Sequence, residues 1–190
     1  MKRIFFLAVM FAAFTVASFA QAKPTDFSGT WMLDMPKSKL SERMRIESLT
    51  MNVTQNAKTL TVATSTTRTQ PPANAPAGAP GTGSGSGGGM LRGGGFGNGD
   101  NTVTYALDGK ETIVEIDGPN GKLPVKYKAL VDGAKINLSN ARSFNGPMGE
   151  VLITTKEAWS LSPDGKTLTV ERENTSPRGT NSSTLVFAKK

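Results

Sequence analysis

The stretch "FSGTWMLD", from Phe27 to Asp34, decides the fold prediction for this chain. Apolar residues alternate along it, so Phe27, Trp31 and Leu33 fall on one face of an extended strand. Gly29 stands on that same face, where a missing side chain leaves room for the indole or for a close backbone approach. The pattern therefore predicts a first strand whose inner face carries one of the chain's two tryptophans.

Residues 1–22, which precede this strand, are typical of a secretory signal peptide. A basic pair at positions 2–3 is followed by a long apolar run, and Ala20-Gln21-Ala22 supplies small residues where a signal peptidase reads. We expect cleavage after Ala22 and a periplasmic or secreted mature chain. The alternative is an uncleaved anchor, although the run is at the short end of the about 17 to 25 residues that span a bilayer. No later segment is apolar enough to cross a membrane, so we expect no transmembrane span after cleavage.

Length and composition favour one domain without a nucleic-acid partner. A chain of 190 residues is ordinary for a single domain. Without the basic pair of the signal peptide, 20 Lys and Arg face 15 Asp and Glu, a formal charge of +5. These bases are spread along the chain, which indicates a solvated surface rather than a binding patch. The chain has no cysteine, so the exported domain has no disulfides and depends on its core.

Residues 70–100 differ in composition from the rest of the mature chain. They contain 12 of the 21 glycines and 4 of the 11 prolines. Such a stretch cannot bury enough apolar surface to offset its ordering entropy, so we expect a disordered loop that interrupts a single domain spanning 23–190. Loop-closure entropy grows slowly with length, so a fold tolerates such an insertion.

The remaining segments alternate apolar and polar residues with the period of a β-strand. In "LPVKYKALV", Leu123 to Val131, every second residue is apolar. Turn-forming pairs such as Asp108-Gly109 and Asp132-Gly133 separate consecutive runs and favour tight hairpins. The only place for a short helix is Met35 to Met44. The predicted strands lie within 27–34, 45–53, 58–69, 101–108, 111–117, 123–131, 134–139, 150–161, 166–174 and 183–189.

These features predict an all-β fold in which an antiparallel up-and-down meander closes into a barrel of about 8–10 strands. Closure removes the exposed edges that a long meander would otherwise leave. A two-sheet β-sandwich is the structural alternative, and the short turns throughout favour the barrel.

"FSGTWMLD" resembles the first strand of the calycin superfamily, the lipocalins and fatty-acid-binding proteins, which begin their barrels with Gly-x-Trp. The resemblance implies a lipocalin-like barrel with Trp31 at its closed end and an arginine from a late strand lying across the indole. Arg172, in "TVERENT", is the candidate, since alternation places it on the inner face; Gly29, Trp31 and Arg172 then form the base of the barrel. The chain also resembles uncharacterised exported bacterial proteins that begin "FSGTWKLD" and contain "WSLSPDGKTLTV".

The residue types present argue against an enzyme. The chain has no histidine and no cysteine, which excludes Ser-His-Asp and Cys-His catalysis and metal sites built on imidazole or thiolate. Glu171 and Glu173 fall on the face opposite to the apolar residues of their strand, so they are expected in solvent. We predict no catalytic residues, no metal and no cofactor.

Alternation places five polar residues on the faces predicted to be internal: Arg68, Tyr105, Tyr127, Glu157 and Arg172. In a cavity with apolar walls, an arginine and a tyrosine could hold a carboxylate, which predicts a binder of a small hydrophobic or amphipathic ligand. The alternative gives each residue a structural role: the tyrosine hydroxyls reach the barrel mouth, Arg68 ends its strand in water and Arg172 covers Trp31. The barrel is then filled with side chains, and the protein is an envelope-associated structural or interaction module.

Overall fold

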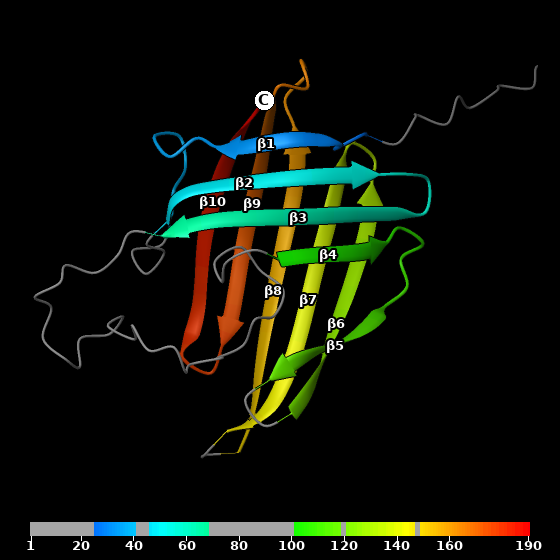
Figure 1. Ribbon diagram of the computed structural model, residues 1–190, viewed down its shortest axis with the longest axis vertical. Coiled ribbons are helices and arrows are strands. Elements are labelled where there is room, and N and C mark those ends of the chain that lie inside the picture. Colours follow the sequence, from blue (N-terminus) through cyan, green and yellow to red (C-terminus); the bar gives the residue numbers. More distant parts are fainter. Residues whose placement is uncertain (1–24, 41–45, 69–100, 119–120, 147–148) are drawn as a thin grey trace, which may run out of the picture.

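Ten antiparallel strands form one sheet in the computed structural model of the chain (Figure 1). The structure describes residues 25–40, 46–68, 101–118, 121–146 and 149–190. The predicted signal peptide and the predicted glycine-rich loop lie outside these residues. The strands are β1 (Gly29–Leu33), β2 (Ile46–Gln55), β3 (Thr59–Arg68), β4 (Asn101–Ala106), β5 (Thr112–Gly118), β6 (Gly121–Asp132), β7 (Lys135–Gly146), β8 (Gly149–Leu161), β9 (Thr167–Ser176) and β10 (Gly179–Lys189).

The order of the strands confirms the predicted all-β meander. Hydrogen-bonded neighbours run β4-β3-β2-β1-β10-β9-β8-β7-β6-β5, so every pairing joins sequence neighbours except that of β1 with β10. That pairing brings the two ends of the described chain together and curls the sheet into a nearly closed barrel. β4 and β5 are the outermost strands and are not hydrogen-bonded to each other. Figure 1 shows β1–β4 crossing the upper parts of the long strands β6–β10, so the core lies between two layers of one continuous sheet.

The hairpins follow the predicted turn chemistry. Asp132 pairs with Lys135, which leaves a two-residue turn between β6 and β7. Gly133 in this turn has φ of 57°, a left-handed conformation that glycine adopts without a steric penalty. The short helix expected within Met35 to Met44 is absent from the described part of that segment, which forms a turn and an isolated bridge between Lys39 and Thr184.

Trp31 lies on β1, the strand that joins β2 to β10. Its side chain is fully buried, and it pairs with Met51 on β2 and with Lys189 on β10. The indole Nε1 donates a hydrogen bond to the carbonyl oxygen of Phe27 at 2.9 Å. Phe27 in turn meets Trp159 edge to face, with ring centroids 6.1 Å apart. The first strand is thereby tied to the long strands through the aromatic core.

The cation over Trp31 is Lys189, and the prediction that Arg172 lies there is wrong. The Lys189 Nζ atom is 5.1 Å from the centroid of the indole. Trp31 pairs in register with Lys189, whereas Arg172 pairs with Ser183. These two positions on β10 are six residues apart, about 20 Å at roughly 3.4 Å per residue, which is beyond the reach of an arginine side chain. Alternation identified the face of Arg172 correctly, but it carries no information about register.

Gly29 makes room for this lysine rather than for the indole. A Cβ atom at position 29 would lie 2.6 Å from Cε of Lys189. Its backbone also has φ of 143°, which side-chain-bearing residues rarely adopt. The Gly-x-Trp spacing therefore combines a backbone conformation reserved for glycine with a buried indole two residues later.

Replacing Trp31 with alanine is expected to lower the free energy of unfolding by about 3 to 5 kcal/mol, because a large aromatic group leaves a cavity in the core. The neighbouring Met32 is 46% exposed on the opposite face, so its replacement by alanine is the matched control and should change stability by less than about 1 kcal/mol. Urea unfolding followed by intrinsic fluorescence, with Trp159 as the remaining reporter, measures both. Equal effects of the two substitutions would show that Trp31 does not secure the barrel end.

Candidate functional site

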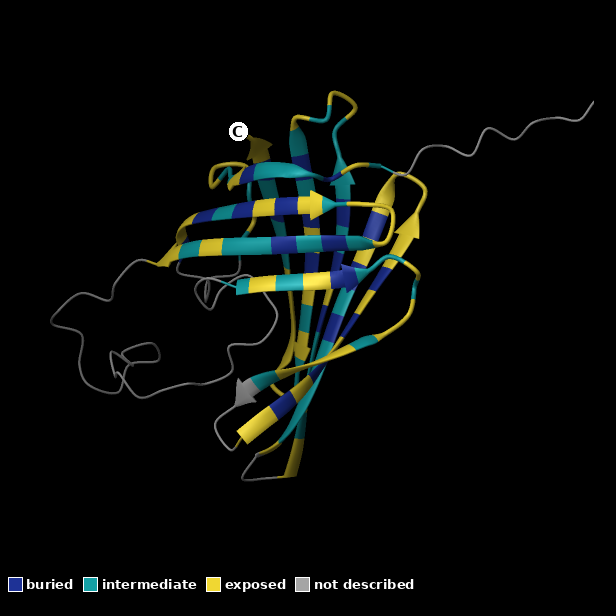
Figure 2. Cartoon of the chain, turned by 45° about the vertical axis from the view of Figure 1, so that its right-hand side comes forward, coloured by how far each residue is buried: buried dark blue, intermediate teal, exposed yellow. Residues whose placement is uncertain are grey.

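The registers of β6–β10 align residues of the inward face into rows across these strands, and Figure 2 shows the buried positions of the strands in dark blue. The upper row is apolar: Ile136, Trp159, Val170 and Leu185 are buried, and Val131 near the end of β6 is exposed. The row below it contains Ala129, Leu138, Glu157, Arg172 and Ser183, and the next contains Tyr127, Asn140, Thr155, Asn174 and the exposed Asn181. The interior therefore changes from apolar to polar within one row.

The polar interior residues form a polar belt, defined by Asn140, Thr155, Glu157, Arg172 and Asn174. The first four are buried, and Asn174 is half-buried. Asn174 Nδ2 donates a hydrogen bond to Thr155 Oγ1 at 3.3 Å. Burying such groups without hydrogen bonds costs free energy, so the belt requires internal partners.

Glu157 is the centre of the polar belt. Its Oε1 atom lies 3.3 Å from Nε of Arg172, the residue directly opposite on β9. Its Oε2 atom accepts a 2.9 Å hydrogen bond from Nε1 of Trp159. Glu157 is 8% exposed and Arg172 is 5% exposed, so this ion pair is shielded from solvent. The carboxylate thus connects the apolar upper row to the belt.

Two tyrosines meet the belt from the side where β4 approaches β6. The rings of Tyr105 and Tyr127 are perpendicular, at 88°, with centroids 5.5 Å apart. Burial, followed by the charge of Glu157, raises the pKa of Tyr105, which also hydrogen-bonds with Asn140. Burial likewise raises the pKa of Tyr127, opposed by the charge of Arg142. Both phenols therefore remain neutral hydrogen-bonding groups.

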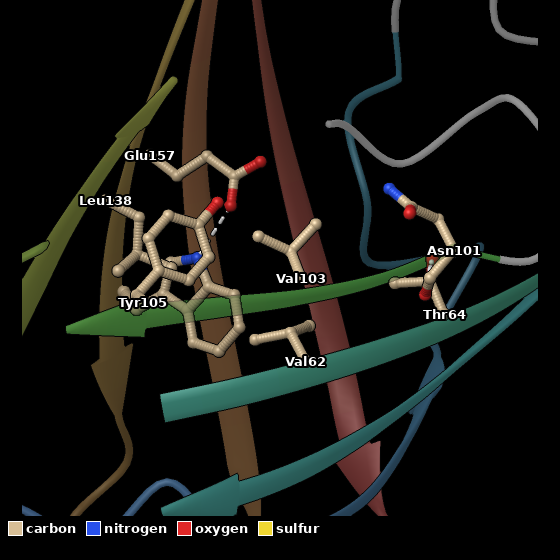
Figure 3. Close-up of a pocket in the computed structure, with 8 residues that line it drawn as sticks. Val62, Thr64, Asn101, Val103, Tyr105, Leu138 and Glu157 are labelled. Atoms are coloured by element: carbon tan, nitrogen blue, oxygen red, sulfur yellow. Dashed lines mark hydrogen bonds between the residues drawn. The ribbon is translucent and has the colours of Figure 1, made fainter. Parts of the chain in front are cut away.

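A small cavity lies between these layers, next to Glu157 (Figure 3). Its volume is about 30 Å³, enough for one or two water molecules but far below the roughly 300 to 1,000 Å³ of small-molecule sites. The lining is mixed. Val62, Val103, Leu138 and Trp159 contribute apolar walls, and Thr64, Asn101, Tyr105 and Glu157 contribute polar groups.

β4, which supplies part of the cavity wall, is an edge strand of the sheet. In the described part of the chain it is not paired with the other edge strand, β5. Moving β4 away from β5 consequently breaks no sheet pairing between them, whereas widening the barrel elsewhere separates a hydrogen-bonded pair of strands. A contact that such a movement must disrupt is the perpendicular packing of Tyr105 on Tyr127.

The structure brings together four of the five residues predicted to line a ligand site. Tyr105, Tyr127, Glu157 and Arg172 lie within the barrel interior. Arg68 is exposed at the end of β3, so it does not join them.

Four further interior polar residues were not predicted from the sequence. Thr155 and Asn174 were recognisable, because they lie on the same alternating faces as Glu157 and Arg172. Asn140 and Arg142 lie beyond the end of the predicted strand 134–139, whereas β7 continues to Gly146. Arg142 is half-buried, and burial lowers its pKa.

No protein-family model matches this sequence, and no curated protein matches it. A similar solved structure is that of the zebrafish ileal bile acid-binding protein complexed with cholic acid. It is 16% identical to this chain, with a TM-score of 0.47, and the match covers 86% of this chain and 98% of that one. Cholic acid is the ligand of the zebrafish protein in that complex.

Replacing Arg172 with methionine is expected to destabilise the protein by about 3 to 5 kcal/mol, because Glu157 loses its buried cationic partner. Replacing both residues, as Glu157→Leu with Arg172→Met, removes both buried charges and should recover more than half of that loss. Urea unfolding of the single and double variants tests this. A double variant no more stable than the single one would contradict the view that the uncompensated charge dominates the effect.

Proposed function

We propose that this chain is an exported, non-enzymatic protein that binds a small hydrophobic or amphipathic molecule inside its barrel. The observation that carries the proposal is the position of the polar belt, which adjoins a cavity lined by both apolar and polar side chains on the unpaired side of the barrel. Ligand sites combine apolar walls with a few polar groups that orient the ligand, and both kinds of group meet here.

The free-energy cost of burying the polar belt supports this function. An apolar core of the same volume avoids the desolvation of Glu157 and Arg172, and replacing such a pair by apolar residues is often neutral or stabilising. A pair kept at the wall of a cavity can instead orient a bound molecule. Because the cavity is small, a ligand must displace β4 or side chains of the cavity wall, and the gap between β4 and β5 is where this costs least.

The small volume of the cavity favours a second candidate function. The cavity beside Glu157 has room for one or two water molecules, as expected where a barrel is filled by its own side chains. In that case the protein is an envelope-associated structural or interaction module, and its outer surface makes the contacts.

Titration with the neutral lipophilic dye Nile red distinguishes the two functions. The proposed binder should give saturable fluorescence, and replacing Val103 with phenylalanine should fill the cavity and weaken binding at least about tenfold. Thr102 is exposed on the opposite face of the same strand, so Thr102→Phe is the matched control and should leave binding unchanged. Absence of saturable binding to the unmodified protein, together with no small molecule retained in native mass spectrometry, would favour the filled barrel.

Export is part of the proposal and rests on the signal-peptide pattern of residues 1–22. No helix among the described residues is long and apolar enough to cross a bilayer. When the protein is expressed in a bacterium that has a periplasm, it should be recovered from the periplasm or the medium with Lys23 as its first residue. An Ala20→Lys variant should retain its signal peptide. Recovery of the full-length unmodified chain from the cytoplasm would overturn export.

A further inference from the structure

We propose that the ligand's polar end is a hydrogen-bond donor, an alcohol or an amine, and that Glu157 makes the site reject a carboxylate. This inference rests on the proposed binding function and specifies its ligand class. It differs from the expectation raised by the sequence, in which an arginine and a tyrosine hold an anionic group.

The first support is the identity of the charged group at the cavity wall. Glu157 lines the cavity, and neither Arg172 nor Arg142 does (Figure 3). Figure 3 shows the Glu157 side chain beside the space bordered by Tyr105, Val62 and Val103. A ligand that enters between these apolar walls therefore meets a carboxylate as its first charged partner.

The second support is the unused hydrogen-bonding capacity of Glu157. An ionised carboxylate has about four acceptor positions and no donor. Nε1 of Trp159 occupies a position on Oε2, and Nε of Arg172 lies against Oε1. Acceptor capacity thus remains on a carboxylate that is 8% exposed, and a hydroxyl or ammonium group can use it.

The two interior arginines are poorly placed to hold an anion at this cavity. Arg172 is paired with Glu157, so its charge is compensated by the same carboxylate that faces the ligand. Arg142 stands on β7 four residues beyond Leu138, the cross-strand neighbour of Glu157, which is about 13 Å along the strand. Because Coulomb interactions weaken with distance, a ligand carboxylate at the cavity is repelled by Glu157 more strongly than it is attracted by either arginine.

Competition with bound Nile red tests this preference with three ligands that share one alkyl chain: decanol, decylamine and decanoate. At neutral pH, and below the concentrations at which these amphiphiles form micelles, decanol and decylamine should displace the dye at concentrations at least about tenfold lower than decanoate. Equal or tighter binding of decanoate would overturn the inference while leaving the binding function intact. The inference also fails if Nile red binds saturably and none of the three displaces it. Absence of Nile red binding, together with no small molecule retained in native mass spectrometry, counts against the proposed function itself.

Substitution of Glu157 assigns the preference to this residue. Glu157→Gln keeps an acceptor for Trp159 but removes the negative charge. The affinity for decanoate relative to decanol should therefore rise by about tenfold or more, and the order of the affinities should reverse. Glu173→Gln is the matched control, because it removes the same charge from the exposed outer face of β9 and should preserve the order. A double variant, Glu157→Gln with Arg172→Gln, leaves no uncompensated buried charge if the single variant does not fold, and it should abolish the discrimination. Unchanged discrimination in the folded Glu157 variants would exclude Glu157 as its source.

Discussion

The ten-stranded sheet is continuous only because β1 pairs on both of its edges. This five-residue strand pairs with β2 on one side and with β10 on the other, and thereby connects β2–β4 to β5–β10. Trp31 stabilises this junction, because its side chain is buried and its indole donates a hydrogen bond to the carbonyl oxygen of Phe27. Every other pairing joins strands that are adjacent in the sequence, so the long-range pairing of β1 with β10 converts a linear meander into a barrel. Burial of aromatic side chains at this junction offsets the conformational entropy that the chain loses on closure.

Closure by β1 leaves the opposite edges of the sheet, β4 and β5, unpaired, and the interior reflects this asymmetry. Near β1 the core is apolar and closely packed. Further down the long strands, the polar belt places the carboxylate of Glu157 and the guanidinium of Arg172 in contact. Both candidate functions use the same fold and differ in one physical quantity, the free energy needed to move β4 and the cavity wall. A low cost allows a ligand to enter, whereas a high cost leaves a filled barrel whose polar belt is structural.

Much of the fold and part of the site could be predicted from alternation and turn chemistry. Alternation placed Tyr105, Tyr127, Glu157 and Arg172 on inner faces, and all four are there. It failed for Arg68, because a strand end emerges into solvent whichever face its last residue occupies. The resemblance to calycins assigned Arg172 to Trp31, whereas the pairing registers place Arg172 opposite Glu157 and bring Lys189 to the indole. An error of register displaces contacts by whole rows even when every face is assigned correctly.

Local sequence patterns are sufficient to predict the all-β class, the order of the hairpins and the faces of most strands. These follow from period-two alternation and from turn pairs such as Asp132-Gly133. Only the tertiary structure decided that β1 meets β10, that Glu157 rather than an arginine faces the cavity, and that β4 and β5 remain unpaired. These features depend on how far strands slide past one another and on where the curved sheet stops short of closure. Both are set by the packing of side chains distant in sequence, which no local pattern encodes.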